Sequence, residues 1–354
     1  MYRAALGLRA RGHAVCLAAP RASAIGERVR AAGIETLPVA FAGDADLRSF
    51  AQMLLHCRRL RPEILCLNMD RVLRVGGIAA RIAGVPVILP RRGSEFPLKN
   101  GWLYRFTYQR VATGVLVNSF ATARTLVRGL AWKPAGEIHV VYNGVDLARF
   151  ERTEPRAETR ARLGEAGDAL VIVVVGELTK RKNARAVIDR LPEWVREFPA
   201  LVVWIVGEGV EREALLDQAG RLGVADRVHL LGFRDDVPDL LAAADLMVHV
   251  ARVEGFGYAV AEAMAAGVPV VAADTSSLPE VVDDGVTGTL VPPEDPAALD
   301  DAVRAFLRDP SRRARFGAAG RARVHERFDA RARLDDLERI LRNELASRGG
   351  TLDV

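Results

Sequence analysis

Cysteine and long apolar runs are both scarce in this sequence of 354 residues. Its three cysteines (Cys16, Cys57 and Cys66) form no Cys-x-x-Cys pair, so neither a zinc site nor a disulfide framework is expected. No apolar run approaches the roughly 20 residues that a spanning helix needs. Hydrophobic residues nevertheless make up 50% of the chain, enough for two cores. We therefore expect a cytoplasmic, two-domain protein with reduced and buried thiols.

Lysine is also rare, because only four of the 50 Lys and Arg residues are lysines. Lys99 and Lys133 stand alone, whereas Lys180 and Lys182 share one short loop after an apolar run. A lysine ammonium acts as a point charge toward phosphate. The pair therefore indicates a phosphate site, and the alternative is the solvated start of a helix.

Acidic residues are few in the first part of the chain. Residues 1–150 contain 22 Lys and Arg against 9 Asp and Glu, while the remainder contains 28 against 36. Such asymmetry favours an anionic surface or substrate for the first part. The basic residues are scattered and form no recognised nucleic-acid module, so we expect no nucleic acid but an anionic membrane or a phosphate-bearing lipid. The alternative is that these arginines only solvate the surface.

Short apolar runs alternate with helical patterns along the whole chain. Continuous apolar runs between turn residues are typical of parallel strands that are covered on both faces. The pattern therefore predicts an α/β protein with two successive doubly wound, Rossmann-like units. The predicted strands are 14–18, 64–67, 85–89, 114–117 and 138–141 in the first unit, and 170–175, 201–206, 228–231, 246–250, 269–272 and 288–291 in the second.

The boundary between the units is predicted near Asn143, where Asn-Gly gives a turn signal and a charged stretch without a strand follows. We expect a first domain over 1–148 and a linker over 149–165. The second domain would occupy 166–330, and a C-terminal helix and tail 331–354.

The most informative stretch runs from Glu254 to Glu262. An apolar strand ends in a loop that carries a carboxylate and two glycines, and a helix then opens with a second carboxylate eight residues after the first. Glycine lets a backbone approach a ligand closely, and the N–H groups of a helix start attract anions. A sugar nucleotide could bind here through its hydroxyls and phosphates.

This stretch resembles the Glu-x7-Glu signature of retaining GT-B glycosyltransferases of family 4, also called glycosyl transferases group 1. Asn143–Phe150 resembles the interdomain Asn-Gly-Val-Asp-x-x-x-Phe of that family, and Lys180–Asn183 resembles its phosphate-binding basic loop. The resemblance covers nearly the whole chain. It implies two Rossmann-like domains that face a cleft, with the donor bound by the second domain and the acceptor by the first.

The resemblance also implies roles for residues of the second half. Lys182 would stabilise the departing nucleoside diphosphate, Glu254 would lie nearest the donor sugar, and Glu262 would hold the ribose. Glu177 stands where the family often has arginine, so Arg181 or Lys180 could take over that contact. Phe233 would line the base pocket, or else belong to the core. The further donor-binding candidates are Gly176, Gly232, Arg234, Gly255, Phe256, Gly257 and Tyr258.

The acceptor half is less defined. The loop after the predicted strand 85–89 lacks the histidine that many family members carry, which leaves Arg91, Arg92 and Glu95 as candidates at the carboxyl end of a strand. Residues 99–110 mix cations and aromatics at helical spacing. That mixture suits a membrane interface or a lipid-linked acceptor, and it equally suits a helix that packs its aromatics into the core.

The first strand of the family pattern and its glycine-rich loop are absent, because the chain opens on a predicted helix over residues 1–11. In a doubly wound sheet this strand is central, so its absence would expose two interior edges. Either the start of the chain is misplaced or truncated, or another segment fills the gap, and of these we expect a truncated start.

These features predict an enzyme that moves a hexosyl unit from a nucleotide-diphosphate sugar to a hydroxyl of a glycan or lipid-linked acceptor. The resemblance implies retention, no metal and no cofactor, and the only Asp-x-Asp segment, at Asp44–Asp46, is interpreted as a chance match. We expect a role in polysaccharide or lipopolysaccharide biosynthesis and a peripheral position on the inner face of the cytoplasmic membrane. Alternatives are a sugar-nucleotide epimerase of the same fold and a non-catalytic sugar-nucleotide-binding protein.

Overall fold

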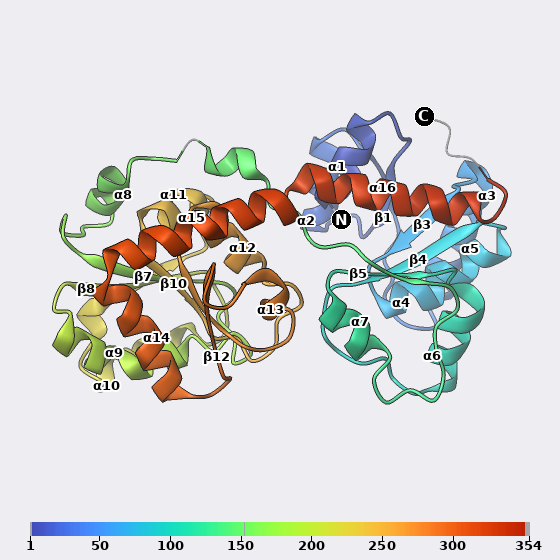
Figure 1. The fold of residues 1–354 in the computed structure, drawn as a ribbon. Coiled ribbons are helices and arrows are strands. Elements are labelled where there is room, and N and C mark those ends of the chain that lie inside the picture. Colours follow the sequence, from blue (N-terminus) through green and yellow to red (C-terminus); the bar gives the residue numbers. More distant parts are fainter. Residues whose placement is uncertain (1, 152, 351–354) are drawn as a thin grey trace. The chain divides into compact units, whose positions relative to one another are not determined.

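The computed structural model describes residues 2–151 and 153–350. The chain forms two compact units (Figure 1). Unit 1 comprises Met1–Tyr142 together with Arg331–Val354, and unit 2 comprises Asn143–Ala330. The chain therefore leaves unit 1 after Tyr142 and returns to it through its last helix.

Unit 2 is built on a six-stranded parallel sheet in the order β12-β11-β10-β7-β8-β9. The first strand of this unit, β7, lies in the middle of the sheet. The strands β8 and β9 follow on one side of it, and β10, β11 and β12 on the other. The switch point of this doubly wound sheet is the pair β7–β10. Its strands are β7 (Leu170–Val175), β8 (Leu201–Val206), β9 (Val228–Gly232), β10 (Leu246–His249), β11 (Val270–Ala273) and β12 (Gly288–Val291).

Helices cover both faces of this sheet, which explains the continuous apolar runs in its strands. Alternate strand residues such as Ile172, Val203 and Val248 form a core with α9 (Arg185–Glu197), α10 (Arg212–Arg221) and α14 (Pro296–Arg308). Other helices lie on the opposite face or follow the strands. They are α8 (Arg156–Arg162), α11 (Val237–Ala243), α12 (Tyr258–Ala265), α13 (Leu278–Val281) and α15 (Pro310–Arg327), with the 3₁₀ turns η3 (Leu147–Phe150) and η4 (Ala225–Arg227).

The parallel sheet of unit 1 is divided into two pieces, with four strands in the order β3-β4-β5-β6 and two strands, β1-β2. Within the described residues, β1 pairs with β2 and with no other strand. Among the same residues, β3 likewise pairs with β4 and with no other strand. No pairing joins the two pieces among the described residues, so this sheet lacks the central strand that would connect them. The strands are β1 (Cys16–Ala19), β2 (Glu35–Pro38), β3 (Ile64–Leu67), β4 (Val87–Arg92), β5 (Val115–Val117) and β6 (Ile138–Val140).

Helices of unit 1 also pack on both faces. On one face, α3 (Leu47–Leu60), α5 (Ile78–Ile82) and α7 (Phe120–Leu126) enclose a core around Ile88 and Val115. On the other face, α1 (Tyr2–Ala10) and α16 (Ala330–Ala346) cover β4 and β5, and Figure 1 shows α16 running across this unit. The remaining helical segments are α2 (Ala24–Ala31), α4 (Asp70–Val72), η1 (Leu73–Gly77), α6 (Trp102–Phe106) and η2 (Thr107–Val111).

All eleven predicted strands are present, with ends that differ by at most three residues. The strand β2 was not predicted. The predicted helix over 1–11 is α1, and Met1 lies outside the described residues, as do residues 351–354 of the predicted tail.

Candidate functional site

The candidate site lies at the switch point of unit 2, where β7 and β10 run in parallel as direct neighbours. The loop after β7 carries Lys182, and the loop after β10 carries Glu254. Because both strands end at the same edge of the sheet, their following loops leave the sheet side by side. Ligands of open parallel sheets bind at such a point. The topology thus brings together two residues that are 72 positions apart in the sequence.

Lys182, Glu254 and His249 form one network, in which Glu254 and His249 are buried and Lys182 is half-buried. The ammonium of Lys182 donates to Oε2 of Glu254, and Nε2 of His249 lies 3.0 Å from the same oxygen. Burial by itself raises the pKa of Glu254, but the bonds from His249 and Lys182 outweigh it and hold that pKa well below its usual range. Burial lowers the pKa of His249. The carboxylate is therefore ionised, and a neutral His249 donates through Nε2–H.

Gly176 lies beside the side chain of Lys182. Its φ of +152° lies in a region that favours glycine, and a Cβ at this position would lie 3.7 Å from Cδ and Cε of Lys182. The aliphatic stem of the lysine thus passes directly over the end of β7. This places the ammonium at the carboxyl end of the sheet.

Arg181 joins the two loops of the site. Its Nη1 donates to the carbonyl of Val253 at 3.0 Å, and the amide of Arg252 donates to the carbonyl of Arg181 at 2.9 Å. The predicted phosphate ligand Arg181 therefore has a structural task in fixing Lys182 beside Glu254. Lys180 is exposed on the same loop, next to this clamp.

The glycines after Glu254 shape the start of α12. Gly257 adopts the left-handed conformation with φ +90°, and a Cβ there would approach Cδ2 of Leu278 to 2.8 Å. The helix opens at Tyr258 without a side-chain cap. Phe256 is buried and packs edge-to-face on Phe328 at 5.5 Å, so its side chain anchors the loop. Gly255 lies between this anchor and Glu254 in the loop.

Glu262 lies in the second turn of α12 and is buried. Its Oε1 is 3.7 Å from Nη1 of Arg149, which belongs to η3 in the predicted linker. Arg149 and His249 are the two residues of this region that the sequence did not point out. The signal for His249 was the single histidine within the apolar run Leu246–Val250, whereas Arg149 carried no signal.

The predicted base pocket lies at the end of β9. Gly232 has φ +70°, and a Cβ there would lie 2.8 Å from Oε1 of Glu208. Phe233 is 76% exposed, so the alternative that it belongs to the core is wrong. Arg234 donates through Nε and Nη2 to both carboxylate oxygens of Asp236, at 2.7 and 2.5 Å. An exposed aromatic beside a fixed cation leaves this edge open to a planar ligand.

The acceptor-side candidates lie in unit 1, where Arg91 and Arg92 end β4. Nη1 of Arg92 donates to both carboxylate oxygens of Asp70 at 2.7 Å, and the hydroxyl of Tyr108 donates to the same carboxylate at 2.7 Å. The charge of Arg92 is thereby neutralised within the unit. Arg91 is half-buried beside it, and Glu95 is half-buried in the loop that follows.

The helical segment formed by α6 and η2 divides its aromatic residues between two faces. Tyr108 is fully buried, and Tyr104 lies under the guanidinium of Arg74 at 4.8 Å. In contrast, Trp102 is 80% exposed and Phe106 is 42% exposed. Of the two alternatives for this segment, core packing therefore describes the tyrosines, and an open aromatic surface describes Trp102 and Phe106.

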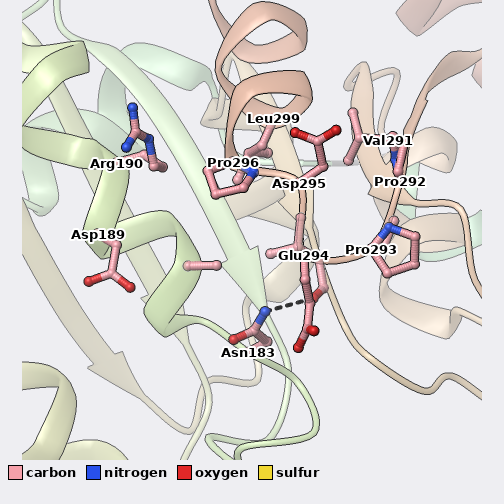
Figure 2. A pocket seen from close by; sticks show the side chains of 13 residues that line it. Asn183, Asp189, Arg190, Val291, Pro292, Pro293, Glu294, Asp295, Pro296 and Leu299 are labelled. Carbon is pink, nitrogen blue, oxygen red and sulfur yellow. Dashed lines mark hydrogen bonds between the residues drawn. The ribbon is translucent and has the colours of Figure 1, made fainter.

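A separate pocket of unit 2 lies over the ends of β10, β11 and β12. Figure 2 shows side chains that line this pocket, among them those of Asn183, Glu294 and Pro296. Asn183 adopts a φ of +58°, and its Nδ2 donates to the carbonyl of Val250 at 3.4 Å. This pocket contains neither Lys182 nor Glu254, so it borders the candidate site without being part of it.

Two absences hold for the described ranges 2–151 and 153–350. In these ranges no three His, Cys, Asp or Glu side chains are grouped so that they could hold a metal ion. Within the same ranges no helix has the length and apolar character that crossing a membrane requires.

Two doubly wound units, one with a cationic loop and a carboxylate at its switch point, define the GT-B class of glycosyltransferases. In agreement, the fold matches the crystal structure of Anabaena Alr3699/HepE in complex with UDP-glucose with a TM-score of 0.84 and 25% identity, over 96% of this chain and 94% of that one. The family model "Glycosyl transferases group 1" matches residues 155–323, and "Glycosyltransferase Family 4" matches residues 1–149. The chain belongs to this family of glycosyltransferases.

Relatives within the family have different activities in their names. The chain is 33% identical to a GDP-mannose-dependent alpha-(1-6)-phosphatidylinositol monomannoside mannosyltransferase of Mycolicibacterium smegmatis, over 77% of this chain and 74% of that protein. It is 30% identical to a glycogen synthase of Mycobacterium tuberculosis, over 77% of this chain and 66% of that protein, which is less than two thirds of its length. Membership of the family thus leaves the donor and acceptor open.

Proposed function

We propose that the protein transfers a hexosyl unit from a nucleotide-diphosphate sugar to a hydroxyl of a glycan or lipid-linked acceptor, with retention and without a metal ion. One observation carries this proposal. The ammonium of Lys182 is held by the ionised carboxylate of Glu254 at the switch point of unit 2, where a diphosphate would bind.

In this proposal, Lys182 supplies the fixed positive charge for the leaving group. The bond between the sugar C1 and the diphosphate oxygen breaks, and the electron pair leaves with the diphosphate. Negative charge therefore grows on the diphosphate during the reaction, and a preorganised cation stabilises the transition state more than the ground state. The groups Gly255, Gly257 and Tyr258 would contact the sugar and phosphates from the loop and the start of α12.

The acceptor hydroxyl forms the new bond to C1, and its proton passes to an oxygen of the departing diphosphate. This step needs no separate general base. Glu254 would lie nearest the donor sugar, and Glu262 would bind the ribose hydroxyls through its carboxylate. Arg91, Arg92 and Glu95 are the acceptor-side candidates of unit 1, and Asp70 holds Arg92 in place.

A lipid-linked acceptor is supported by the outer face of the α6–η2 segment. Trp102 and Phe106 are four residues apart, so they share one face of the helix, and Arg105 and Arg110 are exposed on the same segment. Aromatic and basic side chains together are typical of surfaces that bind anionic membranes. The protein would then attach peripherally to the inner face of the cytoplasmic membrane and act in polysaccharide or lipopolysaccharide biosynthesis.

The proposed activity can be tested with a panel of UDP-, GDP- and ADP-hexoses and a panel of glycan and lipid-phosphate acceptors. We expect one donor to give a glycosylated product whose anomeric configuration, read by NMR, equals that of the donor. We expect equal rates with EDTA and with added Mg²⁺ or Mn²⁺, and no need for a cofactor. A product of inverted anomeric configuration, or activity that EDTA abolishes, would contradict the mechanism. An epimerised free donor would favour the epimerase alternative.

A further inference from the structure

His249 is a buried polar side chain in an otherwise apolar strand. It ends β10 after Leu246, Met247 and Val248, and its exposed fraction is 3%. Leu246 and Val248 point into the core formed with α9 and α14, so the alternation of a strand directs His249 to the opposite face. A buried imidazole requires hydrogen-bond partners. None of the motifs that define the family role of this region requires a histidine at this position.

The partner of His249 is the oxygen that also holds Lys182. Both side chains donate to Oε2 of Glu254, so one carboxylate oxygen has two donors. Burial lowers the pKa of His249 most, Glu254 raises it through its hydrogen bond and charge, and the charges of Lys182 and Arg181 lower it further, so that the pKa stays below its usual value. The imidazole therefore acts as a neutral donor and does not compete with Lys182 as a second cation.

The proposed function requires Lys182 to leave Oε2 of Glu254, and His249 can keep that oxygen hydrogen-bonded. Lys182 must turn from Glu254 toward the diphosphate in order to stabilise it. If Lys182 were the only donor to Oε2, that movement would leave a buried carboxylate oxygen without a donor, which is strongly unfavourable. With His249 in place, Oε2 keeps one hydrogen bond after the ammonium has moved.

We propose that His249 is a positioning residue that keeps Oε2 of Glu254 hydrogen-bonded while Lys182 transfers from Glu254 to the diphosphate of the donor. This inference rests on the proposed function, because it requires that a diphosphate binds beside Lys182. It assigns to His249 an effect that acts through Lys182. Removing the imidazole should make Glu254 retain the ammonium and so weaken the binding of a diphosphate.

The chain provides a matched control in His229. His229 lies on β9 of the same sheet, and its Nδ1 lies 2.8 Å from Oε1 of Glu165. Trp204 donates to the same oxygen at 2.7 Å. This pair has a histidine and a buried carboxylate as well, but no lysine of the site. His229→Gln therefore reports what the loss of a histidine–carboxylate pair does to the unit as a whole.

The test is calorimetric binding of UDP and of GDP to the full chain, which needs no knowledge of the acceptor. We expect His249→Leu to weaken the tighter of the two nucleotides about tenfold, which is the loss of roughly one charge-assisted hydrogen bond. His249→Gln retains an N–H donor and should recover most of the affinity. His229→Gln should leave the affinity unchanged. In the Lys182→Ala background, His249→Leu should change the affinity less than twofold, because no ammonium remains to be released.

The outcomes separate this inference from the proposed function. If the unaltered chain binds neither UDP nor GDP, the proposed function and the inference both fail. If it binds and His249→Leu has the same affinity, or weakens binding equally with and without Lys182, only the inference fails. Thermal unfolding of each variant identifies loss of fold, and should His249→Leu not fold, an affinity of His249→Gln as low as that of Lys182→Ala overturns the inference.

Discussion

In unit 2 the strands β7 and β10 pair directly at the centre of a six-stranded sheet, whereas the sheet of unit 1 is divided between β1 and β3. The two sheets otherwise follow the same order, in which β1 and β2 correspond to β8 and β9, and β3 to β10. Unit 1 therefore has no counterpart of β7 among its described residues. In unit 2, it is the loop after β7 that carries the lysine of the candidate site.

The unbroken sheet of unit 2 explains why the strongest candidates gather there. A complete switch point places two loops beside each other and fixes Lys182, Glu254 and His249 in one network. In unit 1 the candidates lie one strand further out, at the end of β4, and Arg92 is already paired with Asp70. The predictions below test this difference, first through stability and then through function.

The largest expected effect concerns a buried ion-pair network of unit 2. Asp245 accepts from Arg160 at 2.7 Å and from the amide of Val171 at 2.8 Å, and Arg156 lies at 2.5 Å. Asp245→Ala would leave the buried Arg160 unpaired, so we expect a loss of about 3–5 kcal/mol in the free energy of unfolding. Urea unfolding of the full chain measures this loss.

The matched substitution in unit 1 is Asp70→Ala, which breaks the pair with Arg92. The Asp70 side chain is 24% exposed, compared with 7% for Asp245, so water can replace part of the lost interaction. We expect a loss of about 1–3 kcal/mol in the free energy of unfolding. An equal or larger loss at Asp70 would show that unit 1 depends on its buried ion pair as strongly as unit 2 does.

The next effect concerns turnover. Lys182→Ala removes the cation on which the leaving diphosphate depends, and we expect kcat to fall by about 2–4 kcal/mol of transition-state stabilisation, or roughly 30-fold to 1,000-fold. Lys180→Ala is the control, because it removes an exposed lysine of the same loop. Steady-state kinetics with the donor that proves active in the proposed panel of UDP-, GDP- and ADP-hexoses measures both. Equal effects of the two substitutions would contradict the role given to Lys182.

Substitutions of the two signature carboxylates, Glu254 and Glu262, should affect different kinetic constants. Glu254→Gln should lower kcat, because it alters the network beside the reacting sugar. Glu262→Gln should mainly raise the donor KM, about tenfold or more, because a ribose contact is equal in the ground state and the transition state. Glu294→Gln, an exposed carboxylate of the same unit, should change neither. A small and identical change for Glu254 and Glu262 would instead indicate a structural pair.

The smallest effect is expected at the exposed aromatic face of unit 1. Trp102→Ser combined with Phe106→Ser should reduce cosedimentation with anionic vesicles, and salt should release the unaltered protein, since each basic residue near the surface contributes about 1 kcal/mol. Leu47→Ser combined with Leu55→Ser, two exposed leucines of α3, is the control. Equal binding to neutral and anionic vesicles would remove the membrane from the proposal.

Much of the fold could be predicted because the strands are continuous apolar runs. The spans 170–175 and 201–206 were predicted residue for residue, since both strands are buried on both faces. The strand β2 was missed because Glu35–Pro38 mixes polar residues with a proline, as strands at the edge of a sheet can. Its position follows from pairing with β1, which no local pattern encodes.

The candidate site could be predicted where a motif marks it and not where tertiary pairing creates it. Lys182 and Glu254 were identified from two separate motifs, but that they share a hydrogen bond follows only from the parallel pairing of β7 and β10. His249 was overlooked, since a single histidine in an apolar run is compatible with ordinary core packing. The pairing of Arg92 with Asp70 could not be predicted from the sequence either, because it joins the ends of different elements.

The central claim is that Lys182, released from Glu254, binds the diphosphate at the switch point of unit 2. The most direct test is a crystal structure of the full chain with UDP or GDP, whichever binds more tightly in calorimetry. We predict a phosphate oxygen about 2.7–3.0 Å from Nζ of Lys182, with His249 still bonded to Oε2 of Glu254. A diphosphate bound elsewhere, with Lys182 still paired to Glu254, would contradict the account.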